Sequence, residues 1–500
     1  MCGREIYSVG DTAISPAFYY LCNDLSVTMH MMKNILRLLC ATALLAVTAL
    51  SCSKKDDDGA VYYSQKALFL DWGETARVGI SGVNIATFSV SSVPDGWDTP
   101  EIDLSTLSMI ITAPEEGSDA KTTGSIVLRG QTYGGEFVSA SLFVSLATPE
   151  IDMSSAPANC YIANAPNTQY LIDATRKGDG SSIATKRVAV IWQTSQNLIR
   201  YLNLQLDGKA FFFIDADTND ETIVKRGNAL IGAYDAADNL LWSWHIWVTD
   251  FDPDADALQL GDYELMSRQL GALQNGNADN TAIWHSYGLY YQWGRKDPFV
   301  GPADYSASRG TTATLFDGDS NTVRIGMVES SASTGTYAYT NANPLDFVTT
   351  TSNSADWRVG SESNAAWTEA NNPCPYGWKV APADAFAGLS IADDLTGDAA
   401  SYEKRYGWNL TDGTTTSFFF AAGRRIYADG MIQNIFDESI VRSSAIEAQP
   451  WVGYNWATTA AGGSTVFCYW FKKAAPAESG LRTDLQLGRA NGLSVRCVRK

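Results

Sequence analysis

Residues 240–248, which read LLWSWHIWV, decide the fold class of this chain. Successive side chains of a β-strand point to opposite faces of the sheet. One face of this segment is wholly apolar and consists of Leu240, Trp242, Trp244, Ile246 and Val248. The opposite face mixes Leu241, Ser243, His245 and Trp247. Residues 235–239 (DAADN) form a hairpin-loop signal just before it. The pattern therefore predicts a buried β-strand in a β-rich fold.

Similar short runs extend on the N-terminal side of this strand. Residues 150–260 contain strand-like runs at 160–163, 169–172, 188–192, 210–214 and 228–234. Residues 61–149 contain others at 67–70, 86–90, 109–112, 125–128 and 141–146, with turn signals such as Pro94-Asp95-Gly96 between them. Short β-rich runs separated by Gly, Pro and Asp turns are typical of sandwiches. We therefore expect an Ig-like β-sandwich over 61–149 and a second β-sandwich over 150–260.

Residues 261–500 have a different composition, which is rich in Gly, Asn and Thr, and their aromatic residues are scattered among turns. Two segments have helical character, 382–389 and 399–405. A compact domain with this much loop normally needs disulfides or ions to hold its loops.

Several ordered motifs in this last region resemble one known family. They are LMSRQLGA (265–272), YGLYYQWGRKDPF (287–299), NPCPYGWKV (372–380), AAGRR (421–425), GYNW (453–456) and LSVRCVR (493–499). Together they resemble the Fibrobacter major paralogous domain of Bacteroidetes surface lipoproteins, which is related to the C-type-lectin-like fold of formylglycine-generating enzymes. The resemblance covers roughly 261–500 and implies an α+β C-type-lectin-like domain there. The chain departs from the family where Ala381–Phe386 lacks the usual Thr cap and Glu.

The resemblance also implies one disulfide. The lectin-like fold ties its first helix to its last strand, and Cys374 and Cys497 occupy those places. The number of cysteines alone does not fix the pairing, because the four cysteines that follow Cys52 can pair in three ways. The remaining two, Cys160 and Cys468, either pair across domains or stay as free buried thiols.

Residues 32–58 (MKNILRLLCATALLAVTALSCSKKDDD) look like an export signal. A cationic start, an apolar core of about 7–15 residues and small residues at the cut describe a secretory signal. The segment resembles a bacterial lipoprotein signal, with residues 32–51 removed and Cys52 lipidated. The acidic tether, 52–60, resembles the Bacteroidetes signal for display on the outer face of the outer membrane. Residues 1–31 are then expected to be a mis-annotated extension, with the true start at Met29, Met31 or Met32.

The composition fits a globular, extracellular protein. The chain is 45% hydrophobic and 18% charged, with a formal net charge of −19 at pH 7. Such an acidic surface repels phosphate backbones, so nucleic acid is not an expected partner. Attachment to the outer membrane through a lipid anchor needs no basic surface.

The sequence offers little for catalysis or for cofactors. It contains no G-x-S-x-G elbow, H-E-x-x-H motif or P-loop. Formylglycine chemistry needs a reactive, low-pKa cysteine pair, whereas Cys468 lies in the apolar run FCYWF. Residues 317–321 (DGDSN) and 215–220 (DADTND) space hard oxygen ligands two residues apart, as calcium loops do, but neither run completes an EF-hand loop. We expect no enzyme activity and no required cofactor.

Glycan binding would use aromatic faces beside amides and carboxylates. Trp357 and Trp367 lie in polar sequence (SADWRVGSESNAAWTEANN) and are the candidate ligand-binding residues. The expected function is that of a surface lipoprotein, an adhesin or a fimbrial tip or accessory subunit, which binds an extracellular glycan or protein and joins pilus subunits. A glycan-binding lipoprotein of a polysaccharide-uptake system and a formylglycine-generating-type enzyme are the alternatives.

Overall fold

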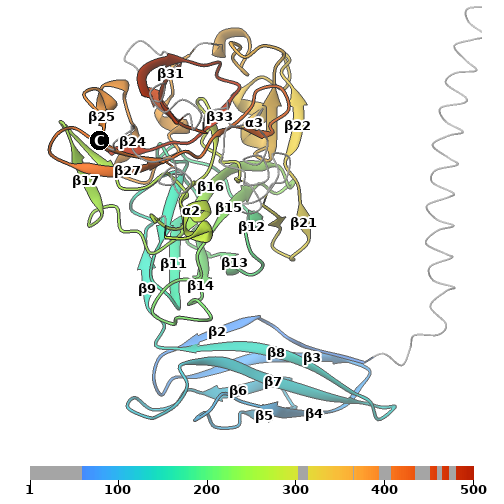
Figure 1. Cartoon of the computed structure of the whole chain (residues 1–500). Coiled ribbons are helices and arrows are strands. Elements are labelled where there is room, and N and C mark those ends of the chain that lie inside the picture. Colours follow the sequence, from blue (N-terminus) through green and yellow to red (C-terminus); the bar gives the residue numbers. More distant parts are fainter. Residues whose placement is uncertain are drawn as a thin grey trace, which may run out of the picture. The chain divides into compact units, whose positions relative to one another are not determined.

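The computed structural model describes residues 59–276, 278–301, 313–363, 365–392, 407–433, 451–458, 464–471 and 480–500. The expected extension, the export signal, Cys52 and the helix over 399–405 lie outside the described residues. The chain divides into two compact units, 1–147 and 148–500. Both consist mainly of strands, as the sequence predicts (Figure 1). Among the helices described, none has the length and apolar character to cross a bilayer.

The N-terminal unit is a two-sheet β-sandwich. Its strands are β1 (Ala60–Tyr63), β2 (Ala67–Leu70), β3 (Thr75–Val83), β4 (Ile85–Ser92), β5 (Glu101–Asp103), β6 (Ser108–Thr112), β7 (Thr123–Thr132) and β8 (Phe137–Leu146). One sheet has the order β1-β3-β6-β5 and the other β2-β8-β7-β4. Both sheets contribute to one apolar core, which includes Val61, Leu68, Val78, Ile111, Leu128 and Leu142. The five strand-like runs expected here all fall within strands.

The first half of the C-terminal unit is also built from strands. They are β9 (Glu150–Asp152), β10 (Cys160–Ala163), β11 (Thr168–Asp173), β12 (Arg187–Gln193), β13 (Arg200–Leu204), β14 (Lys209–Ile214), β15 (Gly227–Tyr234), β16 (Leu240–Val248), β17 (Ala257–Leu260) and β18 (Tyr263–Met266). The sheet β13-β14-β11-β9 packs on the apolar face of β16, where Trp242, Trp244 and Ile246 meet Tyr170 and Phe212.

The second half has short strands and a few short helices. Its helical elements are α2 (Asn280–His285), α3 (Tyr337–Ala342) and the 3-10 turns η1 (Gly360–Glu362), η2 (Glu369–Asn371) and η3 (Ala383–Phe386). Its first strands are β19 (Tyr291–Gln292), β20 (Leu315–Phe316), β21 (Thr322–Val323), β22 (Gly326–Glu329), β23 (Asp346–Thr349), β24 (Trp378–Val380) and β25 (Ser390–Ile391). The last are β26 (Gly407–Thr411), β27 (Thr416–Phe420), β28 (Arg424–Arg425), β29 (Ile432–Gln433), β30 (Trp451–Thr458), β31 (Ser464–Phe471), β32 (Gly480–Gln486), β33 (Gly492–Leu493) and β34 (Cys497–Arg499).

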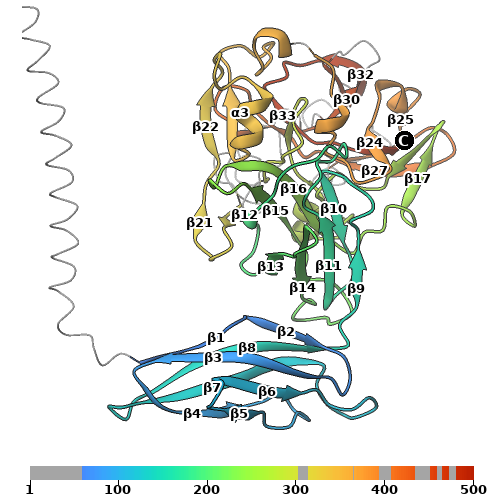
Figure 2. The same ribbon diagram turned by 180° about the vertical axis from the view of Figure 1, so that it is seen from behind.

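The segments 150–260 and 261–500, expected as separate domains, form one compact unit. The six-stranded sheet β10-β16-β15-β12-β20-β21 takes strands from both segments. Its second face, with Cys160, Trp192 and Trp247, shares a core with Trp293 and Cys374 from the later segment. Figures 1 and 2 both show β15 and β16 between β11 and the later strands. This sheet is therefore covered by protein on both faces.

The helix expected over 382–389 is only the 3-10 turn η3, with Pro382 at its N-cap and no side-chain cap hydrogen bond. This fits the loss of the capping Thr, because an uncapped start leaves backbone N–H groups unsatisfied. The six-residue helices α2 and α3 were not expected. Each is capped by a side chain, Asp279 and Thr336 respectively.

Candidate functional site

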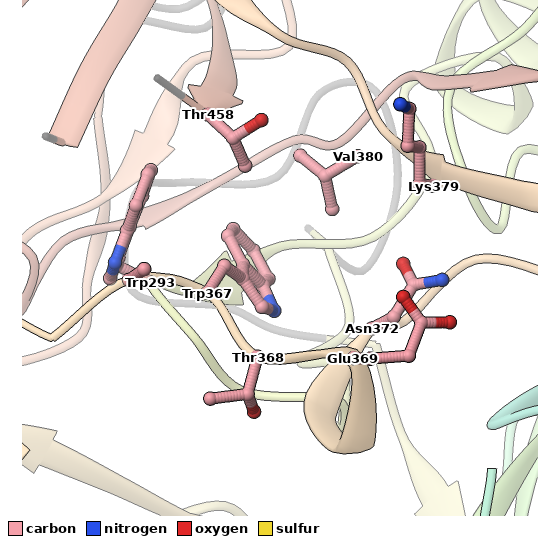
Figure 3. Close-up of a pocket in the computed structure, with 9 residues that line it drawn as sticks. Trp293, Trp367, Thr368, Glu369, Asn372, Lys379, Val380 and Thr458 are labelled. Atoms are coloured by element: carbon pink, nitrogen blue, oxygen red, sulfur yellow. The ribbon is translucent and has the colours of Figure 1, made fainter. Parts of the chain in front are cut away.

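The candidate site is a pocket of about 210 Å3 in the C-terminal unit, and a row of tryptophan rings leads to it. Trp367 is partly buried, and its ring centroid lies 5.1 Å from that of Trp293. Trp293 in turn packs edge-on against Trp456, with centroids 5.3 Å apart. Since Trp293 and Trp456 are fully buried, Trp367 is the outermost ring of the row. Figure 3 shows it in the middle of the lining residues.

The ring of Trp367 is held in place by the η2 turn that follows it. Its indole Nε1–H donates to the backbone oxygen of Asn371 at 2.8 Å. The turn itself is tied to the large sheet, because Asn159 Nδ2, beside β10, donates to the carbonyls of Ala370 and Asn372, both at 2.9 Å. A ring fixed in this way loses little conformational entropy when a ligand stacks on it.

The opposite wall is β24, which carries Lys379 and Val380 into the pocket. This strand follows a turn in which Trp378 N donates to Pro375 O at 3.0 Å, and Gly377 supplies the required positive φ of 79°. β24 pairs with β34, with Val380 opposite Cys497. The structure contains the disulfide between Cys374 and Cys497 that the family resemblance implies. The disulfide therefore links the strand pair to the loop that bears the rest of the pocket.

The polar groups at the pocket are Thr368, Glu369, Asn372, Lys379 and Thr458. Asn372 is already used by the chain, since its Nδ2 donates to Trp378 O at 2.8 Å and its Oδ1 accepts from Cys374 N at 3.3 Å. Glu369 forms an ion pair with Lys500. Lys379 is exposed and lines the pocket, and Figure 3 shows its ammonium directed away from Glu369. The arrangement offers a flat apolar ring with hydrogen-bonding groups around it.

Trp357 is the other residue predicted to bind a ligand, and this prediction is wrong because Trp357 is fully buried. Its Nε1–H donates to Trp293 O at 2.8 Å, and its ring packs edge-on against Tyr337. Its polar neighbours are buried as well. Arg358 and Arg489 both form ion pairs with Asp356, at 2.8 and 3.3 Å. Polar flanking sequence therefore indicated an internal charge cluster here, not an exposed ring.

A larger pocket of about 370 Å3 lies beside β17 and β18. Two of its carboxylates are occupied by the chain, because Asp384 accepts from the Tyr263 hydroxyl at 2.6 Å and Asp412 accepts from Gly261 N at 2.7 Å. Backbone N–H donors lower the pKa of Asp412 to about 2. Among the described residues, Tyr263 is the one aromatic residue in its lining. It therefore suits sugar stacking less well than the tryptophan pocket.

A second chemically notable group lies on the large sheet. Cys160 Sγ lies 3.3 Å from His245 Nδ1, and His245 Nε2 lies 2.9 Å from Asn228 Oδ1. Nucleophile, base and orienting group stand in this order in cysteine hydrolases. All three side chains are buried, with exposures of 1, 1 and 3%. Burial raises the pKa of Cys160 well above its usual value and lowers the pKa of His245 to about 3. The pair is therefore neutral at pH 7 and buried in the described structure.

The buried imidazole predicts a pH dependence of stability. Between pH 6.5 and 3 the unfolded chain binds a proton at His245 and the folded chain does not, so stability falls as the pH falls through this window. From pH 7 to pH 4 this term amounts to roughly 3 kcal/mol of unfolding free energy. Urea unfolding at both pH values should show that loss in the wild type and a smaller loss in His245→Gln. Burial lowers the pKa of His285 as well, so His285→Gln should also reduce the loss, and an unchanged pH slope in His245→Gln would contradict the assignment.

Cys160 and Cys468 are free and buried in the structure. They therefore do not pair across domains, and the second possibility, two free buried thiols, is the one observed. Burial also raises the pKa of Cys468, to about 12. The thiols therefore lack the thiolate character that cysteine chemistry at neutral pH needs.

The two calcium-like runs are turns whose carboxylates bind the chain itself. Asp317 accepts backbone N–H groups from Asp319 and Asn321 at 2.9 and 2.8 Å. Asp215 forms an ion pair with Arg200 at 2.7 Å. Across the described ranges no group of three or more His, Cys, Asp or Glu side chains is placed to hold a metal.

Sequence reasoning found Trp367 but missed Trp293, Lys379 and Thr458 as lining residues. Trp293 and Lys379 lie within the family motifs YGLYYQWGRKDPF and NPCPYGWKV, which indicate the fold and not a ligand site. Thr458 ends β30 and is brought to the pocket by its backbone bond to Ala381 O at 2.9 Å. No local signal marks it.

Comparison with known proteins gave no family. No family model and no curated protein matches the chain. Solved structures with partial similarity include the D00–D0 domain of intimin (11% identity, 38% of this chain, 96% of that chain, TM-score 0.17). Others are the tandem Ig repeats of Dlar (11%, 38%, 97%, 0.14) and Bacteroides ovatus SGBP-B with a mixed-linkage heptasaccharide (13%, 38%, 45%, 0.13). TM-scores this low carry no argument about function.

Proposed function

We propose that this protein is a non-catalytic, surface-displayed binder of an extracellular glycan, acting as an adhesin or as a fimbrial tip or accessory subunit. In this proposal the last region is a C-type-lectin-like domain of the Fibrobacter major paralogous type, and the N-terminal sandwich is an Ig-like stalk module. Acylation of Cys52 holds the chain on the outer membrane, facing outward.

The observation that carries the proposal is the position of Trp367, the outermost and only partly buried ring of the three described tryptophans in the row. Trp367 presents a ring that is fixed by a 2.8 Å hydrogen bond and supported from behind by Trp293. Binding sites for organic ligands combine apolar and aromatic walls with a few placed polar groups. At about 210 Å3 the pocket is smaller than the roughly 300–1,000 Å3 of clefts for drug-sized ligands. It suits a single sugar residue or a chain end.

Replacing Trp367 by alanine should abolish most of the glycan binding. Truncating a buried or half-buried tryptophan anchor typically costs about 2 kcal/mol or more of binding free energy, which is roughly a 30-fold loss of affinity. The measurement is a glycan array with the full chain, followed by titration calorimetry on the ligand found. Trp72→Ala, which alters a partly buried tryptophan of the N-terminal sandwich, is the control and should bind normally. An array without signals, or full binding by Trp367→Ala, would contradict the proposal.

The burial of the free thiols supports the non-catalytic side of the proposal. A formylglycine-type reaction needs an accessible thiolate, and the pKa values of Cys160 and Cys468 are both raised by burial. The Cys160–His245–Asn228 group has the order of a catalytic triad but no exposed member. The chemistry of the described residues therefore favours binding.

A further inference from the structure

Building on the proposed function, we propose that the pocket selects acidic sugars, whose carboxylate is bound by Lys379 while the sugar ring stacks on Trp367. The charges around the pocket are the first argument. Within the described residues, Lys379 has no ion-pair partner, whereas Glu369 on the other side of the pocket is paired with Lys500. Lys379 is thus a pocket-lining cation without a counter-charge among the described residues, in a chain whose formal net charge is −19.

The position of Lys379 is fixed by the fold. The strand that carries it is paired along its length with β34, and Lys379 lies opposite Val498. Its neighbours Trp378 and Val380 are buried, with exposures of 1 and 4%. The Cys374–Cys497 disulfide fastens the same strand pair. Its Cα is therefore held still, and the flexible stem alone adapts to a ligand.

β24 is also the last strand of its sheet, in the order β17-β18-β34-β24. Exposed lysines on edge strands often serve to prevent edge-to-edge pairing. That role predicts no effect of Lys379 on ligand affinity. The pocket position predicts one, because Lys379 lines the same pocket of about 210 Å3 as Trp367. The two roles are therefore separable by measurement.

An acidic sugar makes use of both groups. The apolar face of a pyranose ring stacks on an indole, and a ring carboxylate gives the ammonium a charge-assisted hydrogen bond, which is about twice as strong as a neutral one. A neutral sugar leaves the ammonium hydrated and gains nothing from it. The acidic remainder of the protein opposes an anion only weakly, since charges beyond about 8 Å are screened at physiological salt.

The test is a glycan array on which uronic-acid and sialic-acid oligosaccharides stand beside their carboxyl-reduced forms. The full chain should prefer the acidic member of a pair by about tenfold at low salt, the size of one charge-assisted hydrogen bond at a partly exposed site. The preference should shrink at 0.5 M NaCl. Lys379→Gln should abolish the preference for the acidic member of each pair.

Lys186→Gln is the matched control, because Lys186 is an exposed lysine of the same unit that does not line the pocket. Equal binding of both members of a pair, with loss in Trp367→Ala, overturns the acidic-sugar inference and leaves the proposed function standing. A preference that survives in Lys379→Gln also overturns it. An array without any signal overturns the proposed function and this inference together.

Discussion

Replacing Cys374 and Cys497 together by serine should lower the free energy of unfolding of this protein by about 5 kcal/mol. The disulfide joins residues 123 positions apart. On the chain-entropy model, a crosslink that closes a loop of this length removes about 5 kcal/mol of conformational freedom from the unfolded chain. Urea unfolding followed by tryptophan fluorescence measures the difference.

The reductant response provides the control for this experiment. Dithiothreitol should destabilise the wild type to the level of the double variant and should leave the double variant unchanged. Cys468→Ser removes a free buried thiol, so its stability should remain sensitive to reductant. A double variant as stable as the wild type would contradict a structural role for the disulfide. Since Cys374 and Cys497 flank the pocket wall, glycan affinity should fall along with stability.

Replacing Asp297 by alanine should destabilise the C-terminal unit by roughly 3–5 kcal/mol, the cost of leaving a buried charge without its partner. Asp297 Oδ1 accepts from Lys296 Nζ at 2.6 Å and from Ser243 Oγ at 2.7 Å. Lys296 Nζ also donates to Ser243 O at 3.1 Å and lies 4.5 Å from the ring of Trp242. Both side chains of the ion pair are buried, at 1 and 3% exposure. The lone ammonium would have no counter-charge.

The companion variant is Lys296→Met with Asp297→Ala. Removing both charges avoids the uncompensated ion, and buried pairs replaced by apolar groups are often close to neutral in stability. The double variant should therefore be more stable than Asp297→Ala alone, in urea unfolding at pH 7. If the single and double variants lose the same free energy, the pair does not act as a unit and the explanation is wrong. Asp297→Asn, which keeps the shape, should fall between them.

The same ion pair explains why the expected boundary near residue 260 is not a domain boundary. Ser243 and His245 lie on the less apolar face of β16, which mixes polar and apolar residues in the sequence. In the structure that face is buried against the later segment, where Asp297 accepts from Ser243 and Trp247 Nε1 donates to Ala272 O at 3.0 Å. A polar residue in a strand indicates solvent only when no distant partner satisfies it.

The amino-acid sequence determined the β-class of this protein and the position of most of its long strands, because alternation of apolar and polar side chains is a local property. β10 and β16 have the bounds that their residue patterns predict. The short helices α2 and α3 were missed because six residues do not display a helical period, although Asp279 and Thr336 are recognisable caps. The disulfide followed from family resemblance and not from the residues alone.

Tertiary structure alone decided which tryptophan can meet a ligand. Trp357 and Trp367 lie in equally polar sequence, yet the first is fully buried, and the Asp356 beside it is paired both with Arg358 and with Arg489, 133 residues further along. The pocket likewise joins residues from three segments that are remote in sequence. Burial of a charged or polar residue depends on the partners that the folded chain brings to it, and a local pattern contains no information about them.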